Sequence, residues 1–119
     1  MNLIELFLTL QNQIKVYHWQ TESFAEHEAF GKTYNTLDGL IDEFIEVYMG
    51  KNERIKSKNK FTISLSNYDS NSKDMIKAFV DVLNEDLLKD ISESDTDLIN
   101  LRDEMLSALN KLNYLLTLK

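Results

Sequence analysis

Two histidines and one pair of acidic residues are the side chains of this 119-residue chain best suited to chemistry. They are His18, His27, Asp42 and Glu46. The chain has no cysteine, which excludes disulfides, thiolate metal sites and cysteine nucleophiles. Imidazole nitrogens and carboxylate oxygens remain, and together they suit cations such as Fe²⁺ or Mn²⁺. These four residues are therefore the candidate metal ligands and the candidate catalytic residues.

Each of the four residues also has an ordinary structural interpretation. Asp42 and Glu46 lie one helical turn apart, and on an acidic chain such a pair is commonly part of a solvated face. His27 falls on an apolar stripe, where a histidine is often a hydrogen-bonded, half-buried group. His18 stands between two aromatic residues and fits an aromatic cluster equally well. Only their joint spacing favours a site.

The elements that position these residues are expected to be long helices, because the chain has no proline and only three glycines. Apolar residues recur at three- and four-residue steps in four segments, the period of helices with one buried stripe. The predicted helices span about residues 2–20, 24–49, 72–91 and 96–117.

Local signals mark where the second helix begins and ends. Ser23 and Glu26 match a capping box, which starts a helix near Phe24, and Gly50 stands where a left-handed helix stop is expected. Residues 51–71 lose the helical period and read as a long crossover, with a short β-prone piece at 61–65. The acidic stretch 92–97 fits a tight turn. The prediction is one all-α domain: a ferritin-like four-helix bundle of two antiparallel hairpins joined by the crossover loop.

Helix length decides how the four residues can form a site. His27 and Asp42 are fifteen residues apart on one helix, about 22 Å along its axis, so they cannot share a metal within one subunit. Two such helices packed antiparallel across a two-fold axis, crossing near Asn35, would bring the histidine end of each to the carboxylate end of the other. The spacing thus requires a homodimer with two equivalent sites.

Three short motifs carry a family resemblance: KVYHW at 15–19, HEAF at 27–30 and DGLIDEFIE at 38–46. Together they resemble the first helical hairpin of the Dps, or mini-ferritin, family within the ferritin-like superfamily. That family has a histidine followed by tryptophan or a similar residue, then H-x₃-D, then D-x₃-E fifteen positions after the second histidine. The chain keeps these spacings and departs at Gly31, which stands at the aspartate of H-x₃-D.

The resemblance implies an intersubunit ferroxidase site in which His18 and His27 face Asp42 and Glu46 of the two-fold partner. It implies Fe²⁺ oxidation by peroxide or dioxygen, for iron storage, detoxification and oxidative protection. Zn²⁺ is the expected surrogate metal, and a twelve-subunit cage the implied assembly. The alternative is a structural or interaction bundle with a degenerate metal site and no turnover, which Gly31 favours.

Net charge and hydropathy argue against several classes of binding partner. A net charge of −7 argues against general affinity for nucleic acid or anionic lipid, and we expect no DNA binding. The basic residues of the crossover read as a solvated loop; they are Lys51, Arg54, Lys56, Lys58 and Lys60. No apolar run approaches the ~20 residues that cross a bilayer, so we expect a cytoplasmic protein without membrane contact.

Overall fold

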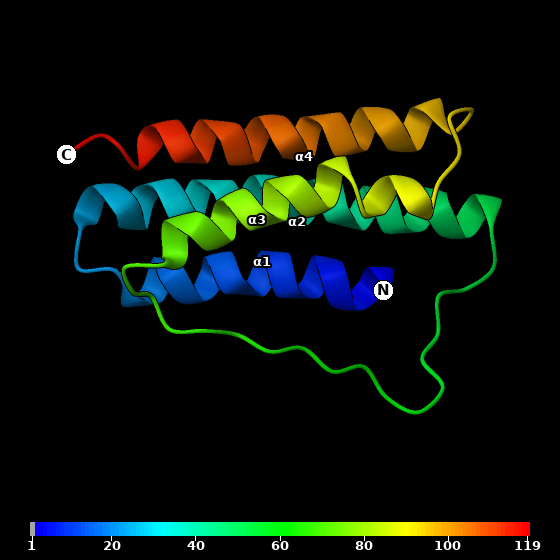
Figure 1. The fold of residues 1–119 in the computed structure, drawn as a ribbon, viewed down its shortest axis with the longest axis horizontal. Coiled ribbons are helices and arrows are strands. Elements are labelled where there is room, and N and C mark those ends of the chain that lie inside the picture. The colour runs from blue at the N-terminus through cyan, green and yellow to red at the C-terminus, as the bar shows by residue number, and fades with distance from the viewer. Residues whose placement is uncertain (1) are drawn as a thin grey trace.

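The computed structural model describes residues 2–119, which form a bundle of helices without strands (Figure 1). The all-α class predicted from the sequence is therefore confirmed. The helices are α1 (Leu3–Gln20), α2 (Phe24–Lys51), α3 (Ser72–Asn84) and α4 (Thr96–Leu115), with a short 3₁₀ turn η1 (Leu87–Lys89) between α3 and α4.

The helices α1 and α2 form one antiparallel hairpin, and α3 and α4 form the other (Figure 1). Between them the crossover loop, residues 52–71, returns along the whole length of the bundle, so that α2 and α3 run in the same direction. The second helix contacts both α1 and α4, and α3 packs against α4. The long helix α2 is thus the central element, and it carries three of the four candidate ligands.

The core is built from the apolar stripes that the sequence shows. Phe7 of α1 and Phe44 of α2 meet edge to face with ring centroids 5.1 Å apart, and both are almost fully buried. Leu83, Leu98 and Met105 from the second hairpin are buried against the same cluster. Burial of each such side chain contributes about 1.5–3 kcal/mol. Packing therefore fixes α2 rigidly between its neighbours.

Two helix ends differ from the sequence expectation. Gly50 does not stop α2, since no glycine among the described residues has a positive φ and the helix continues to Lys51, with Asn52 as its C-cap. The third helix ends at Asn84, seven residues earlier than expected. Asn84 and Asp86 have low helix propensity, and a 3₁₀ turn then places Leu87 fully in the core.

The crossover loop lies as an extended strap along α1, held by three polar side chains of that helix. Glu5 accepts a hydrogen bond from the Thr62 amide, and Gln20 accepts one from the Tyr68 amide. Between them the buried Gln13 both donates to the carbonyl and accepts from the amide of Ser66. Within the β-prone piece 61–65, the Thr62 amide bonds a helix side chain, and the piece forms no strand.

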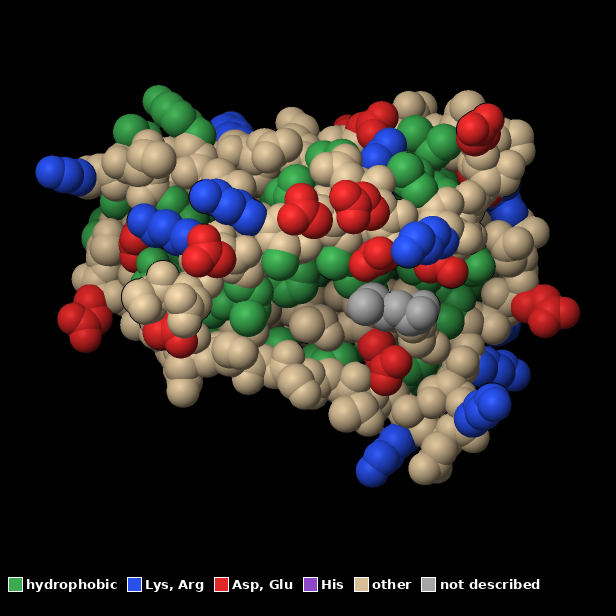
Figure 2. Space-filling view, viewed as in Figure 1, with side chains coloured by type: hydrophobic (Ala, Val, Ile, Leu, Met, Phe, Trp, Pro, Cys, Tyr) green, Lys and Arg blue, Asp and Glu red, His purple; other side chains and the backbone are tan. Residues whose placement is uncertain are grey.

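The basic residues of the crossover are solvated. Figure 2 shows lysine and arginine side chains along the bend of this loop, and Arg54, Lys56, Lys58 and Lys60 are all exposed. Lys51 differs, because it ends α2 and makes 2.7 Å ion pairs with Asp95 and Asp97. Those ion pairs tie the end of α2 to the start of α4.

Candidate functional site

The two histidines face each other across the turn of the first hairpin. His18 lies in the last turn of α1 and His27 in the first turn of α2, and only residues 21–23 separate the two helices. The imidazole rings stack with centroids 3.8 Å apart and planes 15° from parallel. The sequence placed both residues at one end of the bundle, and the structure brings their rings into contact.

A reciprocal pair of hydrogen bonds holds the rings. Nδ1 of His18 lies 2.7 Å from the carbonyl oxygen of His27, and Nδ1 of His27 lies 2.8 Å from the carbonyl oxygen of His18. A carbonyl only accepts, so each Nδ1 carries the hydrogen and donates it. In a neutral ring with this tautomer, Nε2 keeps its lone pair. Metal-bound histidines commonly donate their other nitrogen to such an acceptor, so this arrangement leaves both Nε2 atoms available for a metal.

Gly31 is the position that makes room for the His18 ring. A Cβ atom at residue 31 would lie 2.8 Å from Cε1 and 3.0 Å from Nδ1 of His18, closer than side chains pack. From the sequence, Gly31 is simply a missing carboxylate. In the structure, the absence of a side chain is what allows the ring to lie against α2, so any side chain here requires His18 to move.

Behind the histidines, a carboxylate anchors the hairpin to the strap. Glu26 accepts hydrogen bonds from the hydroxyls of Thr21, at 2.6 Å, and Tyr68, at 2.7 Å. Half of the expected capping box is present, because the Glu26 amide donates to the Ser23 hydroxyl, whereas the Glu26 carboxylate bonds these hydroxyls and does not return to the cap amide. Burial raises the pKa of Tyr68 strongly, and the hydrogen bond to Glu26 raises it further.

Exposed aromatic side chains border the histidine pair. Phe24 is 72% exposed, with its ring centroid 6.4 Å from that of His27. Trp19 is 69% exposed, and the ammonium of Lys15 lies 5.5 Å from its ring and 4.5 Å from the ring of Tyr34. This end of the hairpin therefore combines imidazoles with an uncovered apolar rim.

The carboxylate pair lies on the same helix, toward its other end. Asp42 and Glu46 are both exposed, and a hydrogen bond with Asp42, followed by the charge of Asp42, raises the pKa of Glu46. The Asp42 side chain therefore lies close enough to Glu46 to act on it directly. A hollow of about 360 Å³ adjoins Asp42, with Ile4, Leu8 and Ile45 on its walls. A cation bound here would relieve the repulsion between the carboxylates.

The four candidate ligands thus form two pairs and not one cluster. Fifteen residues of helix separate His27 from Asp42, about 22 Å along the axis of α2. Within residues 2–119, no three metal-ligating side chains lie close enough together to hold one ion. A complete site of three or four of these ligands therefore needs a second copy of the chain.

Comparison with known proteins adds a family but no activity. A family model described as a family of unknown function, DUF5856, matches residues 18–116. The match begins at His18 and contains all four candidate ligands. No curated protein and no solved structure matches the chain. No helix among residues 2–119 is long and apolar enough to span a membrane. The matched segment covers most of the chain, which therefore belongs to the DUF5856 family of unknown function.

Proposed function

We propose that the protein binds Fe²⁺ as substrate between two subunits and oxidises it, as a Dps-like, ferritin-like bundle would. The observation that carries the proposal is the pair of stacked imidazoles whose Nδ1 atoms both donate to carbonyls. That arrangement fixes two neighbouring rings in the tautomer that leaves Nε2 to a metal.

The carboxylate pair supplies the second half of the proposed site. Asp42 and Glu46 are both exposed to solvent, and the hydrogen bond with Asp42, followed by the charge of Asp42, raises the pKa of Glu46. Two imidazole nitrogens and two carboxylates form a donor set that suits Fe²⁺, and Zn²⁺ is its expected surrogate. The donor set of the chain therefore fits the proposed substrate.

A two-fold dimer joins the halves. Residues midway between the pairs, Asn35 and Asp38, are exposed on α2, and a side chain at Gly39 would meet nothing within 4 Å. Two copies of α2 crossing antiparallel near Asn35 place each histidine pair beside the carboxylates of the other copy. The partially exposed Leu8 and the hollow next to Asp42 offer this second copy apolar surface.

The chain direction supports the ferritin-like part of the proposal. A bundle in which a long crossover makes the second and third helices run in the same direction is the arrangement that ferritin-like folds use (Figure 1). A cage of twelve subunits is part of the resemblance, and the dimer is sufficient for the proposed site.

The chemistry is a one-electron oxidation of each Fe²⁺. Two Fe²⁺ ions reduce one hydrogen peroxide, and with two protons the products are two Fe³⁺ and two waters. The imidazoles position the ion, and the carboxylates stabilise the higher charge of Fe³⁺ more strongly than that of Fe²⁺. Dioxygen is the alternative oxidant, and storage of Fe³⁺ would follow in a closed assembly.

A structural bundle without turnover is the second candidate. The reciprocal hydrogen bonds satisfy both Nδ1 atoms and both carbonyls without any metal, so they also close the hairpin by themselves. Such a protein would present its exposed Trp19 and Phe24 to a partner and would leave the carboxylates unused. Oxidation of Fe²⁺, and not metal uptake alone, separates the two candidates.

The rate of Fe²⁺ oxidation tests the proposal. We expect purified protein to oxidise Fe²⁺ in the presence of peroxide faster than buffer, and Asp42→Ala to fall to the buffer rate. Glu43→Ala is the matched control, because it removes an equal charge from the neighbouring exposed position of the same helix and should retain the rate. Equal rates for wild type and Asp42→Ala would refute the ferroxidase and favour the structural candidate.

A further inference from the structure

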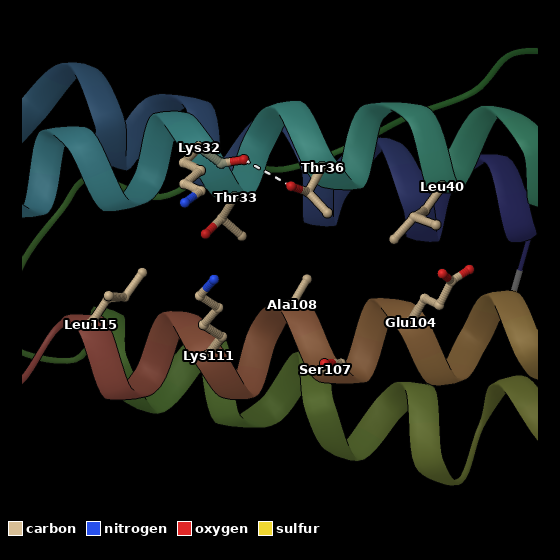
Figure 3. A pocket seen from close by; sticks show the side chains of 9 residues that line it. All are labelled: Lys32, Thr33, Thr36, Leu40, Glu104, Ser107, Ala108, Lys111 and Leu115. Carbon is tan, nitrogen blue, oxygen red and sulfur yellow. Dashed lines mark hydrogen bonds between the residues drawn. The ribbon is translucent and has the colours of Figure 1, made fainter.

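A second hollow, unrelated to the histidines, lies between α2 and α4 and has a volume of about 300 Å³ (Figure 3). Thr33 and Thr36 of α2 and Ser107 of α4 bring hydroxyls to it. The side chains of Ser107 and Ala108 are too small to fill the space between the two helices, so the hollow stays open. The hollow is large enough for a small organic molecule.

Two ammonium groups converge on one end of this groove. Figure 3 shows Lys32 of α2 and Lys111 of α4 pointing toward each other across the gap. Among residues 2–119, neither lysine has a carboxylate within 4 Å, although the protein carries a net charge of −7. Two like charges held on facing helices repel each other unless an anion lies between them.

Hydroxyl groups complete the cationic end. Thr33 is only 6% exposed, and Figure 3 shows its side chain directed into the gap beside the lysines. Thr36 donates its hydroxyl to the Lys32 carbonyl. A hydroxyl directed into the gap beside two ammonium groups adds a third donor for the oxygens of an anion.

The other end of the groove limits what the anion can carry. Glu104 lies seven residues before Lys111 on α4, about 10 Å along the axis. Its carboxylate repels a second negative group at that end, where Leu40 gives the wall apolar surface, and Leu115 lies beyond Lys111 at the cationic end (Figure 3). The ligand therefore has one anionic end and a neutral or positively charged remainder.

We propose that this groove binds a small phosphate monoester, with its phosphate between Lys32 and Lys111 and its remainder directed toward Glu104. Phosphate is favoured over a carboxylate because its three terminal oxygens can meet both ammonium groups and the Thr33 hydroxyl together. The site is separate from the metal ligands, so it stands whether or not the protein oxidises iron.

Titration with inorganic phosphate tests the site, followed by the backbone amide signals of isotopically labelled protein. We expect saturable shifts confined to the groove, and binding at least about tenfold weaker in the double variant Lys32→Gln/Lys111→Gln. Lys58→Gln/Lys60→Gln is the control: it removes the same charge from the exposed crossover and should bind as wild type. Both lysines of the groove are exposed, so the double variant should fold.

Two further arms make the result decisive. Glu104→Gln removes the repulsion and should bind phosphate more tightly than wild type, whereas acetate should bind more weakly than phosphate. The proposal is overturned if phosphate shows no saturation, if the two double variants lose affinity equally, or if acetate binds as tightly as phosphate.

Discussion

The two ends of α2 show opposite ways of holding polar groups. At the start of the helix, His18 and His27 are partly buried, stacked and bonded to each other's backbone, and the helix makes room for them at Gly31. Toward the other end, Asp42 and Glu46 are exposed, and the hydrogen bond and then the charge of Asp42 raise the pKa of Glu46. The first pair is satisfied by the fold, and the second pair is not.

The difference identifies what each pair contributes. The histidine pair is part of the folded hairpin, so its geometry is fixed before any ligand arrives and little ordering entropy is lost on binding. The carboxylate pair is exposed, and in the proposed site a cation would offset the repulsion between its two charges. In the proposed dimer, a rigid half-site of one subunit would meet a charged half-site of its partner.

Removal of one histidine should have the largest effect on stability. His27→Ala removes the hydrogen bond from Nδ1 of His27 to the His18 carbonyl, leaves that carbonyl without its side-chain partner and ends the ring stacking, which together should lower the free energy of unfolding by about 1–3 kcal/mol. Asp42→Ala should leave the free energy of unfolding unchanged or slightly raised. Urea unfolding monitors both variants, and an equal loss for the two would show that the ends of α2 do not differ.

The two glycines of α2 provide a paired test of the close approach at Gly31. Gly39→Ala should stabilise the protein by about 0.5–1 kcal/mol, since alanine favours the helix and nothing lies within 4 Å of the new Cβ. Gly31→Ala should lack this gain, and its stability should fall below that of the wild type, because its Cβ would clash with the His18 ring. Thermal unfolding of both variants measures the two effects. Equal stabilisation by the two substitutions would contradict the claim that Gly31 makes room for the His18 ring.

The smallest effect is expected in the pH dependence. The pKa of Glu46 is raised in the folded state, so the folded protein holds the proton more tightly than the unfolded chain. Its contribution to stability is fully present below the ordinary pKa of 4.5 and is lost as the pH rises through the folded value. Glu46→Gln should therefore lose less stability than wild type as the pH rises above 4.5.

Urea midpoints measured across this pH range give the comparison. Glu53→Gln, an exposed change in the crossover loop, serves as the control and should keep the wild-type profile. A profile for Glu46→Gln that follows wild type would mean that the two carboxylates do not interact. Addition of Zn²⁺ should reduce the pH dependence of wild type, because the cation replaces the shared proton.

Apolar periodicity was enough to predict the helical elements and most of the core. The stripes of α1 and α2 contain the residues found buried, such as Phe30 and Leu37. Apolar residues that recur every 3.6 positions lie on one face of a helix, and that face packs into the core. The break after Asn84 was missed, since Leu83 and Leu87 keep the helical spacing that the weak helix formers between them interrupt.

The details of the site were less accessible. Spacing predicted that the histidines share one end of the bundle and that Asp42 and Glu46 share a face. It could not predict ring stacking, reciprocal bonds to carbonyls or the contact with Gly31, which depend on how the hairpin turn closes in three dimensions. The role of Gln13 was equally hidden, because a glutamine on a helix signals nothing about a strap 53 residues away.

The claim that each site needs two subunits is tested most directly by mixing two inactive variants. Asp42→Ala and His27→Ala are unfolded together, refolded and assayed for Fe²⁺ oxidation. In a mixed dimer, the intact histidines of one variant meet the intact carboxylates of the other, so about a quarter of all sites and of the wild-type rate should return. A mixture no more active than the average of the separate variants would contradict the intersubunit site.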